Sequence, residues 1–223
     1  MSQIINLRKV AISLAMFAVV ALGSAAAAKA DSATFNLNIG STLPSQQYGT
    51  LALELQGDGS IKVTINMING NTLIQTGQDA SIAFNSSLAT DPTIGITGLP
   101  VGYALEFGGV PQNPNSIHMD GFGSYEYGIS SIYGANDPLA AGSMTFFVTK
   151  TGGFSSVFNL VENSTGGTPS PFVVDIFCPT CTAGAQTGFV GTTLAPVPEP
   201  ASMLLLGTGL LGAAGIARRR FRK

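Results

Sequence analysis

Apolar and polar residues alternate with a period of two through most of this chain. The alternation is clearest in two neighbouring runs, where Leu51, Leu53 and Leu55 precede Ile61 and Val63. A period of two is typical of strands in an antiparallel sheet that bury one face. By this pattern and its Gly, Pro and Asn punctuation, strands are expected at residues 34–39, 51–56, 61–67, 80–85, 103–107, 125–132, 143–149, 157–161 and 172–177.

The runs at residues 51–56 and 61–67 are joined by a segment that contains Gly57-Asp58-Gly59. A two-residue turn would pair Leu55 with Lys62 and mix an apolar residue with a cation on one face. A three-residue loop pairs Leu55 with Ile61 and keeps that face apolar. Such a loop needs a left-handed third residue, which Gly59 supplies, so the sequence predicts a three-residue hairpin with a bulge at Gly59.

Residues 31–190 show no helical periodicity over three turns, and turn residues recur throughout. About nine short strands in one domain predict an all-β fold, an antiparallel β-sandwich with a jelly-roll-like arrangement. Residues 191–197 are predicted to form a short tether between this domain and the carboxy-terminal segment.

The amino-terminal segment has the organisation of a secretory signal peptide. Arg8 and Lys9 precede the apolar run Val10–Leu22, and small residues then lead to Ala28-Lys29-Ala30. The run is too short to span a bilayer as a helix, although a membrane anchor or a buried helix is the competing interpretation. We expect residues 1–30 to be cleaved after Ala30, with the secretion translocon and signal peptidase as partners.

The carboxy-terminal segment combines an apolar stretch with a basic cluster. Residues 201–217 carry no charge and are mostly apolar, and five cations follow: Arg218, Arg219, Arg220, Arg222 and Lys223. A basic cluster beside a span stays cytoplasmic, so these residues are expected to act as the membrane stop. The prediction is a single transmembrane helix over 201–217 with the domain outside the cytoplasm. A core helix of a soluble domain is the alternative.

Directly before this stretch stands Pro198-Glu199-Pro200. Two prolines in three residues resist both helix and sheet, which favours an extended and accessible segment. The triplet, the apolar stretch and the Arg cluster together resemble the PEP-CTERM sorting domain of Gram-negative bacteria. The resemblance implies recognition of Pro198, Glu199 and Pro200 by an exosortase-type processing enzyme, with no catalytic role for them. It also implies an inner-membrane intermediate and delivery to the cell surface or the exopolysaccharide matrix.

Net charge changes once the two ends are set aside. Residues 31–197 hold two cations, Lys62 and Lys150, against eleven acids, which gives a charge of about −9. Such a domain is a poor partner for nucleic acid or anionic lipid. Its surface polarity must come mainly from hydroxyls and amides, which suits an extracellular β protein.

The two cysteines stand close together as Cys178-Pro179-Thr180-Cys181. After export an oxidised pair is expected, closing a tight loop with small entropic stabilisation. Two alternatives remain. A redox site would need a helix amino-terminus to lower the thiol pKa, and a zinc site would need four ligands.

No constellation of residues indicates catalysis, and we expect neither an enzyme nor a required cofactor. His118, the single histidine, is expected in a loop without a special role. Glu54 and Glu126 are expected on the outward faces of strands. Calcium binding at the glycine turns of Asp58 or Asp120 stays open, although neither matches a known calcium loop.

Tyr125 and Tyr127 belong to the most distinctive stretch of the domain, residues 120–129, which resembles parts of other proteins with this sorting tail. The two rings could stack on a sugar, or they could pack in the core. Three functions therefore remain: a structural or interaction protein of the surface or matrix, which is favoured, a lectin-like module that binds exopolysaccharide, and a secreted glycan-acting enzyme.

Overall fold

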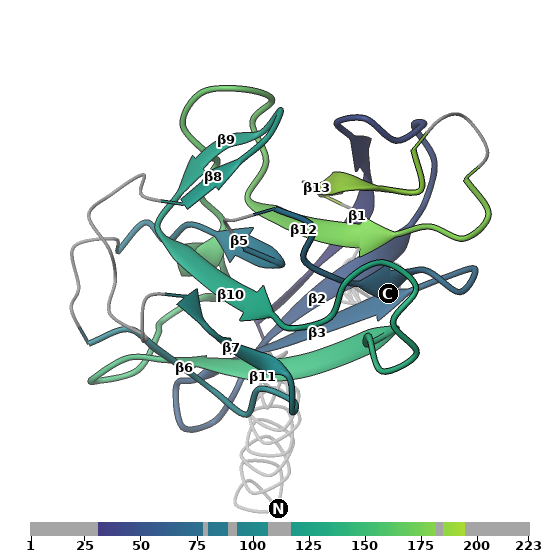
Figure 1. Ribbon diagram of the computed structural model, residues 1–223. Coiled ribbons are helices and arrows are strands. Elements are labelled where there is room, and N and C mark those ends of the chain that lie inside the picture. The colour runs from purple at the N-terminus through teal and green to yellow at the C-terminus, as the bar shows by residue number, and fades with distance from the viewer. Residues whose placement is uncertain (1–30, 78–79, 89–92, 107–116, 182–184, 195–223) are drawn as a thin grey trace, which may run out of the picture. The chain divides into compact units, whose positions relative to one another are not determined.

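The computed structural model describes residues 31–77, 80–88, 93–106, 117–181 and 185–194, and these form an all-β fold (Figure 1). The all-β antiparallel prediction is confirmed, since the pairings between its strands are antiparallel. The strands are β1 (Ser32–Gly40), β2 (Gly49–Leu55), β3 (Ile61–Met67), β4 (Thr72–Leu73), β5 (Ile82–Phe84), β6 (Gly95–Thr97), β7 (Tyr103–Leu105), β8 (Ile117–Met119), β9 (Gly123–Tyr125), β10 (Tyr127–Ser131), β11 (Ser143–Thr149), β12 (Phe172–Phe177) and β13 (Thr187–Leu194).

One continuous sheet holds most of these strands, in the order β6-β11-β3-β2-β1-β13-β12-β5-β10-β7, with β4 added beside β12. Its two edge strands, β6 and β7, follow each other in the chain and are joined only by residues 98–102. Six residue steps span at most about 20 Å, so the sheet must curl until its edges approach each other. The result is a nearly closed sheet around one interior.

The prediction of two packed sheets is therefore corrected. The sheet has two groups, β6-β11-β3-β2-β1 and β12-β5-β10-β7, and β13 lies between them, paired with β1 on one side and with β12 on the other. Without β13 these groups would be separate sheets facing each other. The sequence pattern did not predict β13, and for that reason it led to a sandwich.

The antiparallel pairing sorts the connections into two ends. We call the end that holds Ser32 and Leu194 the terminal end, because the described body begins and finishes there. At the opposite end, the distal end, five connections meet, and we call them the distal loops: residues 41–48, 68–71, 98–102 and 132–142, and the connection from β12 to β13, which is described at 178–181 and 185–186.

The main core fills the interior of the curled sheet. Strands from both groups contribute fully buried side chains to it, including Leu51 and Val63 from one group and Phe84 and Phe172 from the other. Phe84 stacks on Phe172 and on Tyr127, with ring centroids 5.5 Å and 5.3 Å apart. Aromatic contacts of this kind add to the stabilisation from burial, and here they hold β5, β10 and β12 together at the main core.

A second, smaller core lies on the outer face of the same sheet. The β8–β9 hairpin covers it (Figure 1), and its buried residues include Met119, Phe122, Tyr125 and Val173. Along β12, Val173 belongs to this second core and Val174 to the main one. Because both faces are covered there, β12 reads as a run of buried residues without alternation.

The predicted β2–β3 hairpin is confirmed in its register. Leu55 pairs with Ile61, Leu53 with Val63 and Leu51 with Ile65. Gly59 has a φ of 80°, and its N–H donates to the Gln56 carbonyl at 3.0 Å. The left-handed residue therefore stands at the predicted third loop position.

Several local predictions were wrong. Residues 125–132 were expected as one strand, but β9 ends at Tyr125 and β10 covers Tyr127–Ser131, with a break at Glu126. Residues 157–161 were expected as a strand, but Val157–Leu160 forms a 3-10 helix, η2, which buries Val157 and Leu160 and is capped by the Ser156 side chain. Residues 191–194 were assigned to a tether, yet they complete β13, so the folded body extends past position 190. A short helix and a short strand can bury the same apolar spacing, and the pattern alone does not separate them.

The predicted signal peptide, residues 1–30, and the predicted transmembrane helix, residues 201–217, lie outside the described residues. Within the described ranges, no helix has the length and apolar character needed to cross a membrane.

The two glycines of the β2–β3 loop offer a matched pair of substitutions. Gly59→Ala should lower the free energy of unfolding by about 1–2 kcal/mol. The alanine would have to keep the left-handed backbone conformation of Gly59, and its Cβ would lie 2.8 Å from Gly153 Cα. Gly57→Ala should change it by less than about 0.5 kcal/mol, because no atom lies within 4 Å of its Cβ. Urea unfolding of both variants measures the difference. Equal stabilities would contradict the assigned loop conformation.

Candidate functional sites

The last strand is held firmly up to the point where the described body finishes. Gly191 has no room for a side chain, since a Cβ would collide with the Phe122 ring. Thr192 is buried, and its N–H donates to the Ser170 hydroxyl at 2.8 Å. At the end of the strand, Leu194 pairs with Phe35 of β1. Leu194, the last described residue, therefore lies on a strand at the middle of the sheet.

The segment that follows β13 decides how the chain is classified. Residues 196–223 match the PEP-CTERM protein-sorting motif. No curated protein and no solved structure matches the chain. The resemblance drawn from the order of the triplet, apolar stretch and Arg cluster is thereby confirmed for this segment, and the motif implies an exported protein processed by an exosortase-type system.

The PEP-CTERM motif begins very close to the folded body. One residue, Ala195, separates the end of β13 from the matched segment. Pro198 is four steps from Leu194, which is at most about 14 Å of extended chain. An enzyme that binds Pro198, Glu199 and Pro200 would therefore have to approach the terminal end of the sheet to within about this distance. These three residues and the cations Arg218–Lys223 lie outside the described residues, so their roles stay predictions.

The two tyrosines of the distinctive stretch are core residues. Tyr125 is fully buried in the second core, where its hydroxyl donates to the Ser170 carbonyl at 3.1 Å, and burial raises its pKa to about 12. Tyr127 is 6% exposed and belongs to the main core. The packing interpretation of these rings is confirmed, and neither ring presents a face to a sugar. The chain passes from the β8–β9 hairpin to β10 between them, which sends the two rings to opposite faces of the large sheet.

The cysteines form the expected disulfide between Cys178 and Cys181. Both are buried against the main core at the distal end, and Gln46 donates from Nε2 to Cys181 Sγ at 3.4 Å. Their loop follows the end of β12 and contains a turn, with the Cys181 N–H donating to the Cys178 carbonyl at 3.3 Å. The bond fixes the start of the connection between β12 and β13, which is a structural role.

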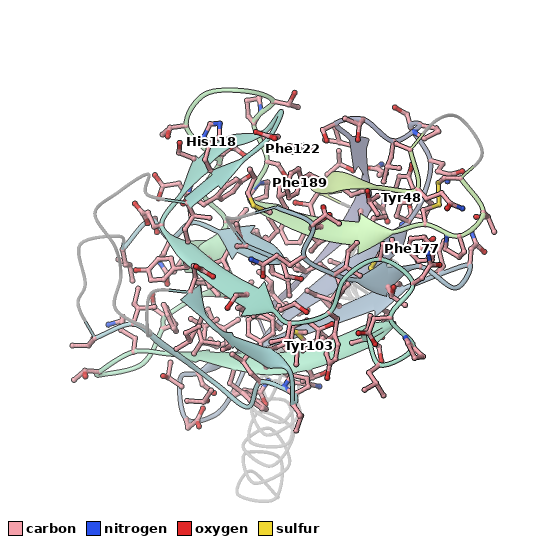
Figure 2. The ribbon with its side chains drawn as sticks, in the orientation of Figure 1. Tyr48, Tyr103, His118, Phe122, Phe177 and Phe189 are labelled. Atoms are coloured by element: carbon pink, nitrogen blue, oxygen red, sulfur yellow. A yellow bond between two sulfur atoms is a disulfide. The ribbon has the colours of Figure 1, made fainter. Side chains whose placement is uncertain are left out.

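The remaining sequence candidates lie apart from one another. His118 lies on β8, at the exposed side of the hairpin (Figure 2), with Nδ1 3.3 Å from the Ser124 hydroxyl. It is thus a strand residue, where a loop was expected. Asp58 accepts from the Ser60 N–H at 2.9 Å and from its hydroxyl at 2.7 Å, which stabilises the turn and lowers the Asp58 pKa. In the described ranges, no three side chains of metal-binding type come together around Asp58, Asp120 or elsewhere.

The acids expected on outward strand faces differ in their surroundings. Glu54 is exposed and forms an ion pair with Lys62 at 3.3 Å across the β2–β3 pair, which contributes little to stability at such a surface position. Glu126 is half-buried at the break between β9 and β10. Burial raises its pKa, and repulsion from Glu162 adds to that effect.

Asp175 is a polar core residue that the sequence pattern did not single out. It is fully buried on β12, and its Oδ2 accepts from the Thr76 N–H at 2.6 Å and from the Thr76 hydroxyl at 2.8 Å. Its other oxygen, Oδ1, is buried without a hydrogen-bond partner. Burial raises the Asp175 pKa and outweighs the opposing effect of the hydrogen bonds to the carboxyl. The carboxyl thus anchors Thr76 to the sheet at an electrostatic cost.

Asp175→Asn tests this balance, because an amide keeps the acceptor for Thr76 and removes the buried charge. A raised pKa in the folded state means that ionisation favours unfolding. The acid's contribution to stability is complete below its unfolded pKa of about 3.9 and is lost as pH rises through the folded pKa. The free energy of unfolding of Asp175→Asn, relative to wild type, should therefore increase over that range. Unfolding curves at several pH values measure it, and a constant difference would contradict the assignment.

Thr76→Val is the companion variant, since valine has nearly the same shape but no hydroxyl. It should lower stability by about 1–2 kcal/mol at neutral pH, because the buried Asp175 carboxyl then loses the hydrogen bond from the Thr76 hydroxyl. An unchanged stability at neutral pH would show that the hydroxyl does not matter to the buried acid.

Proposed function

We propose that this protein is a structural or interaction component of the cell surface or the extracellular matrix, delivered there by an exosortase-type system. The observation that carries the proposal is the PEP-CTERM match at residues 196–223, which begins two residues after the end of the central strand β13. The proposed route has a cleaved signal peptide, an inner-membrane intermediate held by residues 201–217, and transfer of the body to the outside.

A non-catalytic role for the body is part of this proposal. The single histidine lies exposed on the β8–β9 hairpin, and Glu54 is engaged with Lys62 at the surface. Asp175, the fully buried acid of the described body, binds the backbone and hydroxyl of Thr76. The titratable side chains in the described ranges thus have positions that explain them as parts of the fold or of its surface.

The lectin-like alternative loses its main support. It rested on Tyr125 and Tyr127 as a stacking platform, and both rings are buried. The structural role is therefore preferred to sugar binding.

Replacing Pro198, Glu199 and Pro200 with alanines tests the delivery route. The full chain, produced in its native cells, should then accumulate uncut in the inner membrane, while cleavage of residues 1–30 continues. The wild-type protein recovered from outside the cells should have an intact mass that starts at Asp31 and ends near Pro200. Mass spectrometry of both fractions measures the two cleavages.

Pro196→Ala is the matched control, because it removes one proline just outside the triplet. It should be processed at close to the wild-type rate. Wild-type protein that keeps residues 201–223 and is found only in the membrane fraction would contradict the proposal. So would normal processing of the triple-alanine variant.

A further inference from the structure

Exposed aliphatic side chains gather at the distal end. Among the large hydrophobic residues exposed in the described ranges, four lie on distal loops: Val101 at 90%, Ile132 at 80%, Leu139 at 71% and Ile68 at 39%. Phe158, on η2, lies in the connection between β11 and β12 at the terminal end. Single exposed aliphatic residues are ordinary, but a set on neighbouring loops indicates an interaction surface.

These tips are held in place by the fold beneath them. The Ile132 N–H donates to the Gly102 carbonyl at 3.0 Å, and the Tyr133 hydroxyl donates to the Val101 carbonyl at 3.1 Å. Tyr103 packs edge-on against Tyr133 with centroids 5.5 Å apart, and its hydroxyl accepts from the Ala141 N–H. Val101 and Ile132 are therefore presented on a rigid support, which lowers the entropy cost of binding.

The distal loops are almost free of charge. In the sequence of all five loops, Asp137 is the single Asp, Glu, Lys, Arg or His residue, although the body as a whole carries a charge of about −9. Both cations of the body belong to the terminal end, with Lys62 paired to Glu54 and Lys150 following the end of β11. The distal loops offer nothing to an anionic partner, and they do not repel another face of the same composition.

A hollow lies directly beside the most exposed tip. It has a volume of about 340 Å³ and is lined by Gly102 and Ile132 at its rim, with Ala104 and Ser130 on the strands below. Gln75 and Glu106 also line it. The Gln75 side chain accepts from the Ser131 N–H at 2.6 Å, and the Ser130 hydroxyl donates to the Ala104 carbonyl at 3.2 Å. The Gln75 and Ser130 side chains are thus engaged within the fold, and Gly102, Ala104 and Ile132 form the part of the lining that suits an apolar side chain.

We propose that the distal end is a self-association surface. Val101 of one copy enters the hollow of a second copy, and Val101 of the second copy enters the hollow of the first. A protruding tip beside a hollow on one surface is the arrangement that a two-fold symmetric contact requires. Asp137 on the distal loops and Glu106 in the lining of the hollow are the acids of this face, so two such faces bring together few of the eleven acids of the body. The inference uses the described body alone and does not depend on how the tail is processed.

Two other occupants fit the surface less well. Surfaces that dock on membranes combine apolar tips with cations, and here the cations belong to the opposite end. A sugar platform needs an exposed ring, yet Tyr103 and Tyr133 at this end are only 7% and 8% exposed. A second copy presents the same low charge, and its own hollow can receive the protruding Val101.

The test measures the oligomeric state of the protein recovered from the outside of its cells. In sedimentation velocity, the wild type should form a concentration-dependent dimer. Val101→Asp should weaken the dimer at least about tenfold by placing a charge on the tip. Ala104→Phe should do the same by filling the hollow. Phe158→Asp, the matched control at the other end, should leave the dimer unchanged.

A mixing experiment tests the tip-in-hollow geometry itself. The Val101→Asp copy keeps its hollow and the Ala104→Phe copy keeps its tip, so a mixture of the two can form one good contact. The mixture should associate more strongly than either variant alone. Far-ultraviolet circular dichroism and thermal unfolding of each variant check that the fold is intact, as expected for exposed positions.

Three results would overturn the inference. The first is a wild type that stays monomeric up to about 100 µM. The second is loss of the dimer in Phe158→Asp, or an intact dimer in Val101→Asp. The third is wild-type binding to phosphatidylcholine vesicles or to a neutral polysaccharide that Val101→Asp abolishes, while the free protein shows no dimer.

Discussion

The pairing of β13 with two neighbours at once is the constraint on which the rest of this fold depends. β13 meets β1 along one edge and β12 along the other, and so it converts two groups of strands into one curled sheet. If it were absent, two inner edges would each present unpaired N–H and C=O groups beside the core. Contacts across the sheet reinforce the strand, among them the network of Ser170 with Thr192 and Phe172.

The place of β13 in the chain links folding to sorting. β13 is the last described strand, so the sheet can close only when the chain as far as Leu194 is available. The matched sorting segment starts two residues later, so only three residues, 195–197, separate β13 from the Pro-Glu-Pro triplet. A cut at or after the triplet would leave the strand whole. The body can therefore be separated from its tail without loss of the pairing that holds the sheet together.

Antiparallel pairing also separates the surface into two different ends. The terminal end carries both cations of the body and the β2–β3 turn, whereas the distal end carries the disulfide, loops with a single acid and the aliphatic tips. Loops tolerate polar residues at little cost, so four large aliphatic side chains on the distal loops are not explained by folding. Folding does explain the tyrosines, which sequence position alone left open between core and binding site.

The sequence by itself determined the strand character of the body, the register of the β2–β3 hairpin, the disulfide and the sorting motif. Each of these depends on neighbouring residues: alternation with a period of two, a glycine at one loop position, two cysteines three apart, and an ordered tail. Only the tertiary structure decided that most of the strands form one sheet. It also decided that Tyr125 packs in the second core and Tyr127 in the main core, and that the buried Asp175 carboxyl accepts hydrogen bonds from Thr76. These depend on which distant segments pair. The β13 segment, Thr187–Leu194, is rich in Gly and Thr and carries little apolar alternation, because its stability comes from two partner strands far away in the chain.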